Sequence, residues 1–484
     1  MKKAKIYYFT LTDEMRKEEK LNWFRSHSIE QLEFEYINPD KNSNWINLAD
    51  NDWESLISVC SKDVKTGKVK DAIFELFSLG IATNRDEWVY DFDDKNLLKK
   101  TKYFIEKYNQ ILATENPEDS SIKWSSTLKS HFKSKIKLVF NNEKLIEALF
   151  RPFTKMFFYT EKNMSDRLTQ NHYDIFGNEL NKNNQLICFT VGGRLDFNII
   201  AANRLPSLTV FSLDANQCLP LYRYDKSGNR TDNITDWTLE QFRNHYHLSE
   251  PGFSGLKDEQ DLTDGKKRKK SGKSARQKNA EPEISKEDIF HYVYAVLHNP
   301  TYREKYELNL KREFPRIPFY PDFWKWAEWG KALMDLHINY ETAKPFDLKE
   351  HNSRTKAESM RQKKAESAKE PESVYAPKLK IKPRLKADKE KGIIEIDELS
   401  FLSGVPKEAW EYKLGNRSAL EWILDQYKEK KPKDPTIAEK FNTYRFADYK
   451  EHVTDLLKRV CTVSVETMKI VEEMKKEIFD SKLP

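Results

Sequence analysis

The densest apolar stretch of this 484-residue chain covers residues 314–341 and lies between two long polar segments. Pro315, Pro318 and Pro321 each fix φ and lack a backbone N–H, so its first part is predicted to be extended rather than helical. After Asp322, a predicted N-cap, apolar residues recur at three- and four-residue steps, which predicts a helix. So aromatic a segment is expected to pack into a core formed with other parts of the chain.

The chain before this stretch begins with short alternating elements. KIYYFTL, from Lys5, predicts a strand, and residues 13–27 predict an amphipathic helix. IFELF (73–77) and EWVYDF (87–92) are interpreted as two strands joined by a polar turn at 83–86. Residues 97–112 show a clear helical period.

From residue 121 to about 253 the pattern becomes rich in short β-type runs separated by turn signals. The predicted strands are KIKLVF (135–140), KMFFYT (155–160), QLICFTV (185–191), FNIIAA (197–202), LTVFSL (208–213) and QCLPLYRY (217–224). Paired glycines in VGGR (191–194) match no phosphate-binding signature, so they indicate a tight hairpin turn.

The predicted fold class is α+β: a β-rich module flanked by helical segments, with two disordered lysine-rich linkers. Neither linker has enough apolar residues to form a core. Beyond them, a capping box at Ser285 and Pro300 each predict a helix start, KGIIEID (391–397) predicts a strand, and a long helix is expected from about Asp448. The predicted segments are an α/β segment 1–118, a β-rich module 119–255, a linker 256–285, an aromatic helical segment 286–343, a linker 344–375 and a mostly helical module 376–484.

Charge and cysteine content restrict the function only weakly. A net charge of +6, from 83 basic and 77 acidic residues, permits a polyanionic partner without requiring one. Four scattered cysteines without a CxxC pair indicate reduced thiols, and no apolar run is long enough to span a membrane. A cytoplasmic protein without a membrane partner is therefore expected.

No catalytic signature is found in the sequence. Metalloprotease, nucleophile-elbow and P-loop motifs are missing, as are an ExK-type nuclease strand and the Asn/Asp-Pro-Pro-aromatic loop of base-amino methyltransferases. We therefore predict no catalytic residue, no metal ligand and no cofactor held by this chain. The polar loop with Asn84 and Arg85 remains open to two interpretations, a self-bonded turn or a ligand-binding loop.

Several blocks together resemble the C-terminal specificity region of Type ISP restriction–modification enzymes. They are SLGIATNRDEWVYDF (78–92), LFRPFTKMFFYT (149–160), CLPLYRY (218–224), the stretch 288–324 from DIFHYVY to PDFW, and SGVPKEAWEYKLGNRSALEWILDQY (403–427). The resemblance implies target recognition on double-stranded DNA, which positions an adenine-N6 methyltransferase and a helicase/nuclease of the same system. Segment 1–118 is expected to join to the methyltransferase. S-adenosylmethionine and ATP with Mg²⁺ would belong to those modules, so this chain alone is expected not to be an enzyme.

The resemblance also suggests which side chains contact DNA. Arginines and lysines in loops or at strand ends can bind phosphates or base edges. We expect Arg194, Arg204 and Arg223 to read bases, and Arg151, Lys155, Asn416 and Arg417 to contact phosphates or serve the fold, with Asn84 and Arg85 as further DNA-binding candidates. Two alternatives remain, a docking subunit that reads no bases and an active adenine-specific methyltransferase with an unrecognised site.

Overall fold

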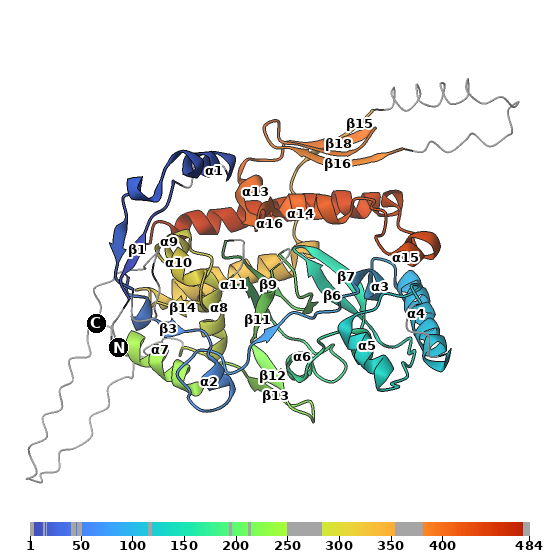
Figure 1. Ribbon diagram of the computed structural model, residues 1–484, viewed down its shortest axis with the longest axis horizontal. Helices are drawn as coiled ribbons and strands as arrows, with labels where there is room; N and C mark the ends of the chain where they lie inside the picture. The colour runs from blue at the N-terminus through green and yellow to red at the C-terminus, as the bar shows by residue number, and fades with distance from the viewer. Residues whose placement is uncertain are drawn as a thin grey trace, which may run out of the picture. The chain divides into compact units, whose positions relative to one another are not determined.

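The computed structural model describes residues 4–12, 15, 17–39, 45, 51–114, 119–192, 196–211, 214–248, 283–353 and 381–477. The chain forms two compact units, Met1–Glu54 and Ser55–Pro484. Both units contain helices and strands, and this mixed content confirms the α+β class (Figure 1).

The unit Met1–Glu54 consists of a strand pair and a helix. β1 (Ile6–Tyr8) pairs antiparallel with β2 (Glu35–Ile37), and α1 (Lys17–Ser26) connects them. Phe9 stacks on Trp23 of α1, with 5.4 Å between the ring centroids. The strand and helix predicted here are confirmed. However, no residue of α1 is buried, so its apolar side is only partly covered.

The larger unit contains a four-stranded sheet in the order β10-β6-β7-β5. Its strands are β5 (Tyr90–Asp91), β6 (Leu145–Arg151), β7 (Thr154–Tyr159) and β10 (Leu205–Pro206). β6 and β7 form an antiparallel hairpin whose tight turn holds Phe153 at φ 54°. The predicted helix 97–112 is confirmed as α4 (Asp94–Thr114), and it packs against β7.

A second four-stranded sheet, in the order β4-β11-β8-β9, is antiparallel throughout. Its strands are β4 (Ser78–Leu79), β8 (Leu186–Thr190), β9 (Ile199–Ala202) and β11 (Asn216–Pro220), and a hairpin of β12 (Tyr222–Tyr224) and β13 (Arg230–Asp232) follows. The strands predicted within 155–160, 185–191, 197–202 and 217–224 are confirmed. So is the β8–β9 hairpin, although its turn residues 193–195 lie outside the described residues.

Three strand predictions are wrong. Two of them lie in this region, and side-chain hydrogen bonds explain both. The backbone of Ile136 and Leu138 bonds to Tyr108 and Asn109 of α4, so 135–140 needs no strand partner. At 208–211 the Val210 N–H donates to the Asn216 side chain within a turn, and residues 212–213 are not described. β6, at Leu145–Arg151, was not predicted.

The third wrong prediction is the hairpin of IFELF and EWVYDF. Asp86–Val89 forms a helical turn, α3, with Asp86 and Glu87 in the first turn, where carboxylates are favoured. Only Tyr90–Asp91 is extended, and β4 and β5 belong to different sheets. Segment 119–255 contains helices as well as its strands. The other described helices before residue 249 are η1 (Ile29–Gln31), η2 (Trp53–Ser55), α2 (Lys62–Lys65), α5 (Ser126–Lys133), η3 (Lys162–Met164), α6 (Gln170–Phe176) and α7 (Asp236–Leu248).

The aromatic helical segment is built as its caps predict. The Ser285 capping box begins α8 (Lys286–Val296), Pro300 is the first residue of α9 (Pro300–Lys305), and Asp322 caps α11 (Phe323–Ile338). A Cβ on Gly330 would lie 1.7 Å from the His291 carbonyl oxygen, so glycine lets α8 and α11 approach closely. The remaining elements are α10 (Glu307–Leu310), η4 (Tyr340–Thr342) and β14 (Arg316–Ile317), which pairs with β3 (Ile57–Ser58) and confirms the extended proline-rich stretch.

The C-terminal part adds a third antiparallel sheet and a long helix. The sheet order is β15-β18-β17-β16, from β15 (Lys349–Asn352), β16 (Pro383–Asp388), β17 (Ile393–Asp397) and β18 (Ser400–Ser403). The other elements are α13 (Glu408–Glu411), a hairpin of β19 (Lys413–Leu414) and β20 (Arg417–Ser418), α14 (Ala419–Gln426), α15 (Pro435–Lys440) and α16 (Phe446–Met474). The predicted strand 391–397 and the long terminal helix are confirmed.

The predicted segment boundaries differ from the units of the structure. The first unit ends at Glu54 rather than at residue 118, because β4 and β5 complete the sheets of the second unit. The start of the predicted linker 344–375 contains β15, which pairs with β18. Most of both predicted linkers, 256–282 and 354–375, lies outside the described residues, so their predicted disorder stays a prediction.

Candidate nucleic-acid interface

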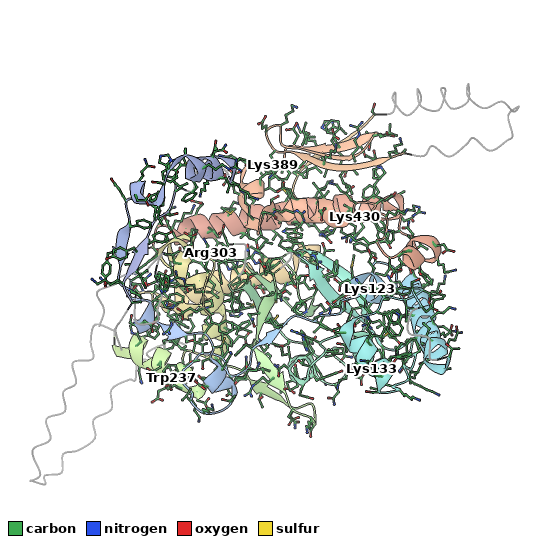
Figure 2. The ribbon with its side chains drawn as sticks, viewed as in Figure 1. Lys123, Lys133, Trp237, Arg303, Lys389 and Lys430 are labelled. Atoms are coloured by element: carbon green, nitrogen blue, oxygen red, sulfur yellow. The ribbon has the colours of Figure 1, made fainter. Side chains whose placement is uncertain are left out.

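A cleft of about 950 Å³ opens in the unit Ser55–Pro484, between the β10-β6-β7-β5 sheet and the α14–α15 connection. We call it the basic cleft. Its basic lining residues outnumber its acidic ones eight to five: Lys100, Lys123, Arg151, Arg417, Lys428, Lys430, Lys431 and Lys433 against Asp86, Glu87, Asp91, Asp425 and Asp434. Figure 2 labels Lys430 on the α14–α15 side and Lys123 on the α4–α5 side. Such a lining attracts polyanions.

Prolines and a short helix hold the lysine-rich side of the cleft. Residues 427–434 read YKEKKPKD, and Pro435 begins α15 with Asp434 as N-cap. Glu87 of α3 accepts hydrogen bonds from the backbone N–H groups of Lys433 (3.0 Å) and Asp434 (2.9 Å). The Trp88 indole donates to Asp434 over 2.8 Å. α3 therefore fixes the lysine loop against the sheet.

The lysine side chains of this loop are suited to contacts with phosphate groups. Lys431 and Lys433 are exposed and Lys428 is half-buried. Among the described residues, Lys430 alone of these four pairs with a carboxylate, Asp425 at 3.2 Å. Cations without carboxylate partners on one rim are able to neutralise phosphates.

The polar loop 83–86 is a self-bonded turn that also lines the cleft. The Arg85 N–H donates to the Thr83 hydroxyl (3.2 Å), as in a self-bonded turn. Asn84 adopts φ 54°, is exposed and lines the cleft, and its amide donates to Asp166 over 2.5 Å. The side chain of Arg85 points inward instead.

Arg85 is a buried structural cation. Its guanidinium lies 3.1 Å from Asp166, and the two side chains are 0% and 4% exposed. Burial lowers the pKa of Arg85 to about 10, against the opposing charge of Asp166, so it stays protonated at neutral pH. It also donates to Ser125, the N-cap of α5. In this position Arg85 holds the loop rather than facing a ligand.

Arg151 lies at the end of β6, on the cleft wall. Its guanidinium lies 4.0 Å from the centre of the Phe150 ring, and its Nη1 donates to the Phe150 carbonyl (2.7 Å) and the Ser207 hydroxyl (3.2 Å). Burial lowers the pKa of Arg151, and the charge of Asp86 opposes this shift. No carboxylate of the described chain forms an ion pair with it.

Arg417 and Asn416 belong to the β19–β20 hairpin. Arg417 lines the cleft, stacks on Trp422 at 5.0 Å and pairs with Asp425 at 3.2 Å. Asn416 is exposed in the two-residue turn and does not line the cleft. Of the predicted site residues, the cleft thus gathers Asn84, Arg151 and Arg417.

The other predicted residues lie elsewhere and have acidic partners. Lys155 pairs with Glu341, Arg204 with Glu147 at 3.7 Å, and Arg223 with Glu75 at 2.7 Å. Arg194 lies outside the described residues. Their DNA-binding roles stay predictions. Lys123 and the lysines of 428–433 were not predicted as site residues, although four lysines interrupted by proline within six residues are a visible signal.

The described residues offer no metal centre and no membrane segment. No group of three or more His, Cys, Asp or Glu side chains is arranged there to hold a metal ion. None of the helices in the described ranges is long and apolar enough to cross a membrane. All four cysteines are buried and free.

Comparisons with known proteins agree on one family. Residues 72–456 match the family described as the Type ISP C-terminal specificity domain. The chain is similar to a solved structure described as a cryoEM structure of a DrdV–DNA complex, with 40% identity and a TM-score of 0.80 over 98% of this chain and 44% of that one. A search of curated proteins finds no match.

Two further solved structures have the same architecture. One is a nuclease-deletion mutant of the Type ISP restriction-modification enzyme LlaGI with a DNA substrate mimic, at 26% identity and TM-score 0.71 over 99% of this chain and 40% of that one. The other is the ATP-dependent Type ISP restriction-modification enzyme LlaBIII bound to DNA, at 24% identity and TM-score 0.69 over 93% of this chain and 26% of that one. At this identity the similarity concerns the fold alone. The chain spans less than half the length of each.

Proposed function

Because the chain belongs to the Type ISP C-terminal specificity domain family, we propose that it is the DNA sequence-recognition part of a Type ISP restriction–modification system. The basic cleft carries this proposal, because within the matched region it places Arg151, stacked on Phe150, beside lysines that form no ion pair in the described chain. Lysines supply phosphate contacts, which give affinity at any sequence, and arginines can contact base edges. DNA-bound relatives support double-stranded DNA as the partner.

The catalytic steps are assigned to other modules of the same system. The chain covers 44% of the DrdV chain, which leaves room there for a methyltransferase and a helicase/nuclease. S-adenosylmethionine and ATP with Mg²⁺ would act in those modules, in the cytoplasm, and this chain would position them on the target site. Heat of S-adenosylmethionine binding to this chain by calorimetry would instead favour an active methyltransferase.

We predict that the chain binds duplex DNA with a strong dependence on salt. The cleft has four lysines without an ion pair among the described residues: Lys123, Lys428, Lys431 and Lys433. If each neutralises a phosphate, the slope of log K against log salt is about −3.6, at about −0.9 per contact. Fluorescence anisotropy with a labelled duplex between about 0.05 and 0.2 M salt measures this slope. A chain that binds no duplex at low salt, yet forms a stable complex with a methyltransferase, would be a docking subunit that reads no bases.

The unit Met1–Glu54 is proposed to dock onto the methyltransferase module. Tyr7, Phe24, Ile29 and Tyr36 are each about half exposed or more, at 59%, 49%, 67% and 51%. Exposed apolar side chains of this density, most of them aromatic, are typical of protein interfaces. A partner of matching apolar surface is therefore expected.

The double variant Phe24→Ser, Tyr36→Ser is expected to weaken binding of a methyltransferase module from the same system by roughly tenfold or more, because buried aromatic side chains dominate interface energies. Sedimentation of the mixture measures the complex. Phe401→Ser, which removes a 37% exposed aromatic ring from the other unit, serves as the control. Equal binding by the double variant and the control would rule out this face.

A further inference from the structure

Tyr90 brings a hydrogen-bonding group without a partner in the described chain to the basic cleft. The residue is 4% exposed and lines the cleft, and its hydroxyl has no hydrogen-bond partner among the described residues. Its ring packs between Phe150 (4.9 Å) and Phe158 (4.7 Å), so the side chain is held in place. A buried hydroxyl without a partner destabilises the free protein, and native proteins rarely tolerate one without a ligand or water to satisfy it.

Arg151 offers the complementary group beside it. Its Nη1 is occupied by the Phe150 carbonyl and the Ser207 hydroxyl, whereas Nε and Nη2 donate to none of the described residues. The stacking on Phe150 fixes the plane of the guanidinium. A fixed guanidinium with free donors can form two parallel hydrogen bonds to O6 and N7 of guanine.

The two groups act on each other electrostatically. Burial raises the pKa of Tyr90, the charge of Asp86 raises it further, and the charge of Arg151 lowers it. Asp86 and Arg151 both line the basic cleft, so the Tyr90 hydroxyl senses the charges of that wall. It stays protonated at neutral pH and can both donate and accept.

Arg417 differs from Arg151 because it has an ion-pair partner. It also stacks on an aromatic ring in the same cleft, but its Nη1 lies 3.2 Å from Asp425, so its charge already has a partner. Arg151 lies half-buried without such an ion pair in the described chain. Burying a guanidinium without a carboxylate is costly unless a ligand supplies acceptors.

We propose that Tyr90 and Arg151 form a base-reading pair that contacts the edge of one guanine in bound DNA, while the lysines of the cleft hold the phosphates. This inference rests on the proposed function and goes further, because it separates the groups that give specificity from those that give affinity. It also moves base reading from Arg204 and Arg223, which pair with glutamates, to the wall of the cleft.

Selection from a randomised duplex library tests the pair and yields the target motif in the same experiment. The complete chain and the variants Tyr90→Phe, Arg151→Gln and Arg417→Gln each select bound duplexes, which are then sequenced. We expect Arg151→Gln to reduce the preference for guanine at one position by roughly 5- to 150-fold. Tyr90→Phe should weaken binding of the selected motif by roughly 2- to 10-fold and leave binding of unselected duplexes unchanged. Arg417→Gln should keep the motif.

Thermal melting separates these effects from folding. Tyr90→Phe removes only the unpartnered hydroxyl, so its melting temperature should equal or exceed that of the original chain. If Arg151→Gln does not fold, the result for Tyr90→Phe alone tests the proposal. The proposal is overturned if the original chain selects a motif that Tyr90→Phe binds equally well, or that Arg151→Gln selects unchanged. A chain that selects no motif at all would overturn the proposed function, and this inference with it.

Discussion

Replacing Lys428, Lys431 and Lys433 together by glutamine is expected to weaken binding of any duplex on the order of a hundredfold at about 0.1 M salt. Each lysine that neutralises a phosphate contributes about 0.9 to the slope of log K against log salt, so the slope should fall by nearly three. Anisotropy titrations of the same labelled duplex at several salt concentrations measure both quantities.

These three lysines are chosen because no competing interaction masks their loss. None of them forms an ion pair within the described residues, whereas Lys430 pairs with Asp425. Their loop is held through the backbone, by Glu87 and by the Asp434 cap, and these contacts survive the substitutions. The melting temperature should therefore change little.

A charge-matched control separates a local contact from general attraction. Lys129, Lys133 and Lys137 lie on or just after α5, are exposed, and do not line the basic cleft. Their triple glutamine variant has the same net charge as the cleft variant, so long-range attraction falls equally in both. An equal loss of affinity and slope in the two variants would show that the cleft is not the phosphate-binding surface.

The helical core could be predicted because its signals are local. Ser285, Pro300 and Asp322 each begin a helix within a few residues of the feature that identifies them. The strand predicted at 135–140 is wrong because the side chain of Asn109, far from it in the sequence, satisfies the backbone of Leu138. Partners far along the chain leave no trace in a local pattern.

The candidate site was predictable only in part, for a similar reason. Basic residue types at strand ends identified Arg151 and Arg417, but burial and pairing, which decide their roles, depend on tertiary contacts. Arg85 and Arg151 look alike in the sequence, yet one pairs with Asp166 in the interior and the other lies on the cleft wall. The lysine loop joins the cleft only because Glu87, more than 340 residues earlier, binds its backbone.

Arg85→Ala is expected to destabilise the larger unit by about 3–5 kcal/mol, because it leaves the Asp166 carboxylate buried without its cation. The change also removes the bond to Ser125 and with it the link between the 83–86 loop and α5. Thermal melting of the variant measures the loss as a clear drop in melting temperature.

The double variant Arg85→Met, Asp166→Leu tests whether the effect comes from the unpaired charge. It replaces the pair by apolar side chains, and because a buried pair contributes little net stability over such a replacement, most of the lost stability should return. The burial of Arg85 indicates a structural role. The fraction of Arg85→Ala that folds should therefore bind DNA with an unchanged slope of log K against log salt. The opposite result, an unchanged melting temperature with a slope reduced by about 0.9, would mean that Arg85 reaches a phosphate, as the sequence first suggested.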